Sequence, residues 1–485
     1  MHEPTMHKRT IHETTRNRGI AFFVVLSLCS VVGVTSGYAS RPVTIVKRYT
    51  QADREAGRYQ YVPFEVPRGT GSLRVIYSYD RADGNNVIDL GLFEPGSLEL
   101  GTGAFRGYSG GAKSEVVISA GETTRGYRPG PIPAGTWHVM LGLYKVADNG
   151  APVTITVEAT PGPPPPAPPP AKAPAGIAGT GPQWYTGALH THTLHSDGRV
   201  EPRDLLGRFG AAGFDFVFIT DHNNTTHRWE LGPELASGAR PLWMVGEEVT
   251  TPAGHASVWG LDPGEWVDFR VSAEDRRIGE LIAAAHRQGA LFSVNHPVSS
   301  CAGCSWEHSF AGIDGMEIWN GGHTAPAEVL DLWDRQLRTG HRVTAVGASD
   351  WHRDPDPMDV ASVRVFAQSL APAAILDALR AGRVIVTRDA QIETPDVIVR
   401  AGTASARVGD SLRGGGPVRI EVAAPSLAGG TVRVVSNGEP AATSAIAGDG
   451  TGTVSGEFRG YVRLELFAAD GTAAAFTNPV YLSGK

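Results

Sequence analysis

Cysteine is scarce in this chain of 485 residues, which contains three. Cys29 lies in an N-terminal apolar run, so Cys301 and Cys304 in the motif CAGC are the pair that remains. A zinc ribbon needs a second cysteine pair, and the sequence has none. In an oxidising compartment a local Cys301–Cys304 disulfide is the favoured prediction, with a redox motif as the alternative.

An excess of basic residues is also missing, because the formal net charge is −7. Proteins that bind nucleic acid or an anionic membrane surface generally carry a basic excess. We therefore expect no nucleic-acid partner.

Long apolar runs are confined to the N-terminus. Four basic residues precede the run IAFFVVLSLCSVVGV (residues 20–34), and the small residues of TSGYAS follow it. This order predicts a secretory signal peptide over residues 1–39, with an uncleaved anchor as the alternative. No later segment is long and apolar enough to span a membrane. We expect an exported protein, secreted or periplasmic/extracellular, without membrane attachment after cleavage.

Proline-rich sequence marks a boundary at residues 161–181, PGPPPPAPPPAKAPAGIAGTG, which predicts a semi-rigid polyproline linker. Short alternating runs such as SLRVIYSY predict an all-β sandwich over residues 40–160. Similar runs predict a second β domain over residues 393–485. Residues 182–392 alternate apolar strands with helical stretches, which predicts an α/β domain, with a small (β/α) barrel as the favoured fold.

Histidine is concentrated in that middle domain, where twelve of the sixteen lie between His190 and His352. Most ligand-type clusters follow a predicted strand: HTH after WYTGAL, DH after FDFVFIT, HP after LFSVN and SDWH after VTAVGA, while EE closes PLWMVG. Catalytic loops of α/β barrels lie at this end of the strands. His255 instead begins the strand ASVWGL, which predicts a hairpin beside the strand at residues 242–249.

Residue spacing supports a shared metal site. Residues i and i+2 of extended backbone share one face, so His190 and His192 can bind a single ion, as can Asp350 and His352. Imidazole and carboxylate together suit zinc, manganese or iron better than calcium or magnesium. Each motif alone has a structural explanation, such as a helix cap. Six of them in one domain together predict a site with several ions.

The ordered motifs HTHTLHSDG, ITDHN, GEEV, NHP and GASDWH resemble those of the PHP (polymerase and histidinol phosphatase) metallohydrolases over residues 184–390. The exported architecture and FTNPVYL near the C-terminus are similar to the carbaryl-hydrolase-like (CehA/McbA) branch. The resemblance implies a distorted (β/α)7 barrel between two β domains, with two or three metal ions and Glu248 as the bridging carboxylate. The ligands that it implies are His190, His192, Asp197, His222, Glu248, His255, His296, Asp350 and His352.

Further residues around these motifs have predicted roles. His195 departs from the family pattern, and we expect it outside the direct ligands. Asp221 is predicted to orient a neighbouring imidazole. Arg199 and Arg353, each beside a ligand motif, are candidate substrate-binding residues.

The metal site predicts hydrolysis by a metal-activated water, with Asp350 and His352 among the catalytic residues. The middle domain has no G-x-S-x-G elbow for a serine nucleophile. The family favours a phosphoester substrate, and the narrower branch implies a carboxylester or carbamate as the alternative. A third hypothesis is a non-catalytic surface binding protein. We expect zinc or manganese, with iron as a further option, a small-molecule ester substrate, and cell-wall or carbohydrate contact through the β domains.

Overall fold

The structure is a computed structural model that describes residues 41–172, 174–231, 240–322, 327–414 and 416–483. The predicted signal peptide, residues 1–39, lies outside this part of the chain. Residues Ala39–Lys485 form one compact unit by their contacts. Within the described residues, no helix has the length and apolar character needed to cross a membrane.

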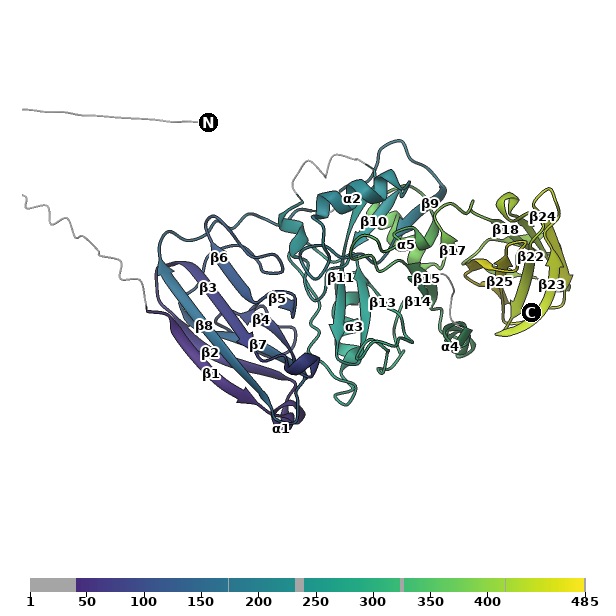
Figure 1. Cartoon of the computed structure of the whole chain (residues 1–485). Coiled ribbons are helices and arrows are strands. Elements are labelled where there is room, and N and C mark those ends of the chain that lie inside the picture. Colours follow the sequence, from purple (N-terminus) through teal and green to yellow (C-terminus); the bar gives the residue numbers. More distant parts are fainter. Residues whose placement is uncertain (1–40, 173, 232–239, 323–326, 415, 484–485) are drawn as a thin grey trace, which may run out of the picture. The chain divides into compact units, whose positions relative to one another are not determined.

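Two four-stranded antiparallel sheets, with strand orders β1-β8-β3-β6 and β2-β7-β4-β5, build the region before the proline-rich segment (Figure 1). Its elements are β1 (Val43–Tyr49), α1 (Gln51–Ala56), β2 (Tyr59–Val66), β3 (Thr70–Tyr79), η1 (Ala82–Gly84), β4 (Val87–Phe93), β5 (Phe105–Gly110), β6 (Glu115–Ser119), β7 (Gly135–Lys145) and β8 (Ala151–Pro161). Alternating buried positions turn one face of each sheet inward, as in β8. The core between the sheets includes Val75, Ile88 and Trp137.

The proline-rich segment packs against the middle of the chain. The indole Nε1 of Trp229 donates to the carbonyl of Pro168 at 2.9 Å, and the amide of Ala171 donates to the carbonyl of Arg228 at 2.9 Å. Proline has no N–H, but its carbonyl still accepts, and the intervening alanines supply amides. The segment is therefore held to the middle region at Pro168 and Ala171 by hydrogen bonds.

The middle region is a mixed sheet with the strand order β15-β14-β13-β12-β11-β10-β9-β16-β17. Its strands are β9 (Gln183–Ala188), β10 (Phe216–Ile219), β11 (Leu242–Thr251), β12 (Gly254–Trp259), β13 (Leu291–Val294), β14 (Gly315–Asn320), β15 (Thr344–Ala348), β16 (Val360–Ala367) and β17 (Val384–Asp389). Its helices are α2 (Pro202–Ala211), η2 (Thr226–Trp229), α3 (Ile278–Arg287), α4 (Ala327–Arg338) and α5 (Pro372–Arg380).

This pairing confirms the α/β class but does not show the (β/α)7 barrel. β9, β10 and β11 are parallel, as are β13, β14 and β15. β12 and β16 run antiparallel to both of their neighbours. A tight turn joins β11 to β12 and forms the hairpin predicted around His255, and such a turn makes the second strand antiparallel.

The C-terminal strands form a second sandwich that shares its sheet with the middle region. β17 pairs with β26, and the order continues through β25, β22 and β23, with β20 and β27 alongside; the facing sheet is β19-β18-β21-β24. The elements are β18 (Asp396–Ala401), β19 (Ala404–Ala406), β20 (Ser411–Arg413), β21 (Val418–Ala423), η4 (Pro425–Leu427), β22 (Thr431–Ser436), β23 (Glu439–Ala445), β24 (Thr451–Gly456), β25 (Tyr461–Phe467), β26 (Ala473–Thr477) and β27 (Val480–Ser483).

Aromatic packing joins the N-terminal sandwich to the middle region. The ring of Phe105 stacks on that of Trp266 with centroids 4.0 Å apart, and the ring of Tyr108 lies 4.8 Å from that of Phe269. These residues belong to the same buried apolar cluster as the strands of the middle sheet. Burial of aromatic surface on this scale holds the sandwich in place, so its residues can take part in a site on the middle region.

Candidate metal centre

The deepest part of the centre joins the two-residue motif at His190 to Asp350 and Glu248. The Nε2 atoms of His190 and His192 lie 3.0 Å apart, and Asp350 Oδ1 lies 3.2 Å and 3.1 Å from them. Glu248 Oε1 is 3.2 Å from His190 Nε2. Two ligand atoms that each lie about 2.1 Å from one ion at a tetrahedral angle are about 3.4 Å apart. His190, His192 and Asp350 are thus close enough together to share an ion, and Glu248 lies beside His190.

Glu248 also contacts three further imidazoles. Its Oε2 lies 2.7 Å from His222 Nδ1, and its Oε1 lies 3.2 Å from His255 Nδ1 and 3.5 Å from His296 Nε2. The side chain is 1% exposed. A buried carboxylate whose two oxygens face different histidines can bridge two ions.

A third group lies at the open side of the centre. Asp197 Oδ1 is 3.2 Å from His352 Nε2, 3.5 Å from His222 Nε2 and 3.9 Å from His192 Nδ1. The Asp197 side chain is 47% exposed, whereas His192 is fully buried. His192 and His222 also face Glu248, so this group is continuous with the deeper ones. The structure thus brings all nine predicted ligands into one connected cluster.

Unsatisfied polar atoms test whether the cluster fits metal ions. Glu248 Oε2 and Asp350 Oδ1 are buried and have no hydrogen-bond partner in the described part of the chain. The close contact of Glu248 Oε2 with His222 Nδ1 is not aligned as a hydrogen bond. Buried carboxylate oxygens are normally hydrogen-bonded, since leaving them bare is costly. Divalent ions on these lone pairs would remove that cost, so the residues fit a metal centre.

The pKa shifts of the side chains in the centre also fit a metal site. Although burial opposes protonation, Asp350, Glu248 and Glu317 raise the pKa of His190 well above its ordinary value. Burial alone would raise the pKa of Glu248, but His190, His222 and His255 hold it well below the ordinary range. Burial, together with His352 and His222, lowers the pKa of His192 to about 4. The Glu248 carboxylate is therefore ionised and favours added positive charge.

Strand ends and backbone conformation place these groups. His296 follows β13 and has a φ of +25°, and Asp350 follows β15 and has a φ of +52°. Residues other than glycine rarely adopt positive φ, and each such position costs about 1–3 kcal/mol. A strand that simply continued would direct these side chains elsewhere. Strain at two of the predicted ligands is typical of a functional site.

Sequence reasoning missed Glu317, which β14 places behind two predicted ligands. Its Oε1 lies 2.9 Å from His190 Nδ1, and its Oε2 accepts from the backbone amide of His296 at 2.8 Å. A carboxylate behind a metal-binding imidazole fixes its tautomer and orientation. A single charged residue in the largely apolar strand GMEIWN was the available signal.

Asp221 lies apart from the ligand imidazoles. It accepts from the amide of Thr193 at 2.8 Å, the hydroxyl of Thr193 at 2.7 Å and the hydroxyl of Ser196 at 2.7 Å. The imidazole near it is His227, whose Nδ1 is 3.3 Å from Asp221 Oδ2. Its carboxylate thus holds the loop that follows His192, while the imidazole it touches lies outside the predicted ligand set.

His195 also lies outside the ligand cluster, where we expected it. Its Nδ1 is 2.8 Å from the hydroxyl of Thr226, and its Nε2 is 3.4 Å from Glu230 Oε2. The side chain is buried rather than exposed to solvent. A turn over residues 194–197, closed by the hydrogen bond from the Ser196 amide to the Thr193 carbonyl, separates it from His192.

A pocket of about 420 Å³ opens over the third group of ligands. Asp197, His222 and His255 line it together with Arg199, whereas Arg353 is exposed and does not line it. The structure therefore brings one of the two predicted substrate-binding arginines to the pocket. Another part of the wall is Cys304, which is bonded to Cys301 in a disulfide with Cα atoms 5.5 Å apart.

Comparison with protein-family models gave no match, and comparison with curated proteins gave none either. Among solved structures, the chain is similar to a two-domain protein from Bacteroides vulgatus that contains a predicted PHP-like metal-dependent phosphoesterase. Identity is 17%, the TM-score is 0.36, and the match covers 64% of this chain and 98% of that one.

Two further structures show weaker similarity. One, from Bifidobacterium adolescentis, is described provisionally as a metal-dependent phosphoesterase: 19% identity, TM-score 0.28, covering 36% of this chain and 92% of that one. The other is an amidohydrolase from Chromobacterium violaceum: 17% identity, TM-score 0.27, covering 41% and 96%.

Proposed function

We propose that this protein is a metal-dependent hydrolase of the PHP type that cleaves phosphoesters, with two or three divalent ions, zinc or manganese and iron as a further option. The observation that carries the proposal is the sharing of ligands. Three overlapping groups could each hold an ion: His190, His192 and Glu248; His222, Glu248 and His255; and His192, Asp197, His222 and His352.

Bound divalent ions would supply an acidified water molecule and neutralise negative charge that develops during hydrolysis. The residues of the chain shield the ligand atoms from solvent and orient them. Its buried floor at His190 and Glu248 keeps solvent from the deep ligand atoms, and Glu317 fixes the imidazole of His190. At the open side, Asp197 and His352 are the partly exposed members that a substrate meets first.

The choice of a phosphoester is supported by Arg199, which lines the pocket beside Asp197. A guanidinium suits the oxygens of a phosphoryl group. A carboxylester or carbamate, as the resemblance to the carbaryl-hydrolase-like branch implies, is the second candidate, because a lone arginine also suits a carbonyl-derived anion. A purely structural metal site is disfavoured, since such sites close their coordination with four ligands, whereas here the groups overlap.

Export and partners belong to the proposal as well. The basic, apolar and small residues at the N-terminus support export to the periplasm or the cell exterior. We propose a small-molecule ester as substrate and no nucleic-acid partner. Contact of the β sandwiches with cell wall or carbohydrate is a further proposal.

The test combines metal analysis with two substrates. The protein, loaded with manganese or zinc, is assayed on an aryl phosphate and on the matching aryl carboxylester. Turnover of the phosphate supports the proposal, turnover of the ester alone supports the second candidate, and metal without either activity supports a binding protein. Asp350→Asn should lose both metal and activity. Asp354→Asn is the matched control, because that carboxylate is 65% exposed.

A further inference from the structure

One wall of the pocket comes from the N-terminal sandwich. Asp89 of β4, Tyr108 of β5 and Tyr144 of β7 line the same pocket as His222 and Asp197. They reach it because alternate residues of a strand face opposite sides. Ile88, Leu90 and Leu92 fill the sandwich core, whereas Asp89 and Phe93 face the middle region.

Asp89 is a charged residue in a buried, otherwise apolar strand. It is 6% exposed, and its hydrogen bond in the described part of the chain is the one that Tyr108 donates to Oδ2 at 2.6 Å. Burial raises its pKa to about 6, although Tyr108 and His222 act against this. At neutral pH the group is therefore a buried carboxylate with no ion pair among the described residues, which is costly unless it binds something.

Glycines around Asp89 make room for it and leave its second oxygen open. Asp89 pairs with Gly142 of β7, where an added Cβ would lie 3.1 Å from the Cβ of Asp89. Added Cβ atoms at Gly110 and Gly111 would lie 3.8 Å and 3.9 Å from Oδ1. An added Cβ at either position would thus be in van der Waals contact with that oxygen. Oδ1 thus faces the pocket through a gap that two glycines provide.

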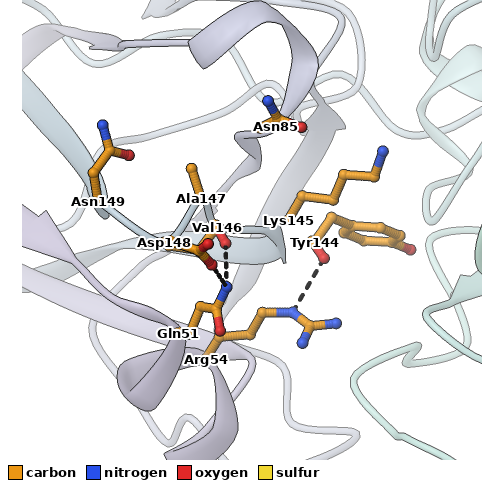
Figure 2. Close-up of a pocket in the computed structure, with 9 residues that line it drawn as sticks. All are labelled: Gln51, Arg54, Asn85, Tyr144, Lys145, Val146, Ala147, Asp148 and Asn149. Atoms are coloured by element: carbon orange, nitrogen blue, oxygen red, sulfur yellow. Dashed lines mark hydrogen bonds between the residues drawn. The ribbon is translucent and has the colours of Figure 1, made fainter.

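Tyr144 offers a second polar atom on the same wall. Its hydroxyl is buried and has no hydrogen-bond partner among the described residues. Arg54 Nε donates to its backbone carbonyl at 3.1 Å, and Figure 2 shows the phenol ring directed away from Gln51 and Arg54. The residue lines both the hollow of Figure 2 and the pocket over the metal centre.

We propose that Asp89 is a specificity residue, which accepts a hydrogen bond from a hydroxyl or amino group of a substrate bound in this pocket. This inference rests on the proposed function, since it requires a substrate whose ester group is held at the metal ligands. Tyr108 is a positioning residue that fixes the carboxylate. The N-terminal sandwich then takes part in substrate selection, in addition to packing against the middle region.

The test measures binding rather than turnover. Propylphosphonate, 3-hydroxypropylphosphonate and 3-aminopropylphosphonate differ in the group at the far end, and each is titrated calorimetrically into the manganese-loaded protein. A hydrogen bond to a buried charged group corresponds to about tenfold in Kd or more. We expect the hydroxyl or the amino compound to bind about tenfold more tightly than propylphosphonate, and the tighter of the two identifies the donor.

Variants assign that preference to Asp89. The Kd ratio is that of propylphosphonate to the tighter-binding hydroxyl or amino compound. Asp89→Asn should bring this ratio close to one while manganese content stays unchanged. Gly111→Val, which leaves Asp89 in place but narrows the approach to Oδ1, should do the same. Gly121→Val is the matched control, because nothing lies within 4 Å of an added Cβ there. Tyr108→Phe should reduce the ratio by a smaller factor.

The outcomes separate this inference from the proposed function. Equal Kd values for all three compounds, no binding to manganese-loaded protein, or an unchanged ratio in both Asp89→Asn and Gly111→Val overturns the role of Asp89. Hydrolysis of propyl phosphate, measured on the same sample, tests the phosphoesterase. A donor preference that depends on Asp89, without hydrolysis, would leave the specificity site standing and refute the phosphoesterase. Failure to take up manganese would refute both.

Discussion

Asp221 and Asp350 occupy equivalent places in the sequence but have opposite surroundings. Each is the second residue after a strand, β10 for Asp221 and β15 for Asp350, and each is close to a histidine in the chain. Asp221 accepts three hydrogen bonds from Thr193 and Ser196. Asp350 Oδ1 is buried, has no hydrogen-bond partner in the part of the chain that the structure describes, and faces the Nε2 atoms of two imidazoles.

The difference shows how to separate a structural carboxylate from a metal-binding one. A buried carboxylate that protein donors satisfy has little capacity left for an ion, whereas one that faces only imidazole nitrogens retains its lone pairs. Position after a strand is common to both aspartates and does not distinguish them. The hydrogen-bond partners do.

The largest effect is expected for Asp350→Asn. The amide removes a charged ligand atom, so metal affinity should fall more than about 100-fold, beyond the 10–100-fold typical of residues behind the ligands. Activity should be lost with the metal, while both β sandwiches stay folded. Metal content by elemental analysis and circular dichroism check this. Unchanged metal stoichiometry would remove Asp350 from the metal site and with it the contrast to Asp221.

Glu317→Gln should weaken metal binding less, by about 10–100-fold, because Glu317 acts through the imidazole of His190. The substitution keeps the size of the side chain and removes its charge. Competition with a chelator measures the affinity. Glu280→Gln, on an exposed carboxylate of α3, is the control and should leave affinity unchanged. Equal affinity in Glu317→Gln and the unsubstituted protein would mean that His190 is oriented without it.

Asp221→Asn should have the opposite balance of effects from Asp350→Asn. It should mainly lower the free energy of unfolding and have a smaller effect on metal affinity. Hydrogen bonds to a charged acceptor contribute about 1.5–3 kcal/mol, and the amide of Asn would face the donors of Thr193 and Ser196. Chemical denaturation of the metal-free protein measures the free energy of unfolding. A variant as stable as the unsubstituted protein, but unable to bind metal, would make Asp221 a ligand.

The smallest effect is expected for His195→Ala. This imidazole contacts Thr226 and Glu230 rather than the metal ligands, so activity should stay within about threefold, and stability should fall by about 1 kcal/mol for the lost hydrogen bond. Steady-state kinetics and thermal unfolding check the two values. Loss of metal in this variant would extend the centre to His195.

Sequence patterns predicted a good part of this arrangement. The two-residue spacing of His190 and His192 follows from strand geometry, and their Nε2 atoms indeed meet. The hairpin at His255 also follows from its position before a strand. The antiparallel course of β16 and the sheet shared through β17 and β26 were not predictable, because strand direction depends on distant partners rather than on local periodicity.

Sequence patterns did not predict the roles of Glu317 and Asp89, for a related reason. Glu317 and Asp89 each look like a lone acidic residue in an apolar strand. Their partners are 127 and 19 positions away in the chain, so no motif connects them. Arg353 adjoins a ligand motif in the sequence, but its side chain is exposed and does not line the pocket, so its role in substrate binding stays a prediction.

The amino-acid sequence by itself determined which side chains could bind metal and that they follow strands, because ligand chemistry and side-chain alternation are local properties. Tertiary structure alone decided which carboxylates keep bare oxygens, which imidazoles share Glu248, and that the N-terminal sandwich faces the pocket with Asp89. Those features depend on contacts between residues far apart in the chain, where packing and hydrogen bonding fix what periodicity cannot.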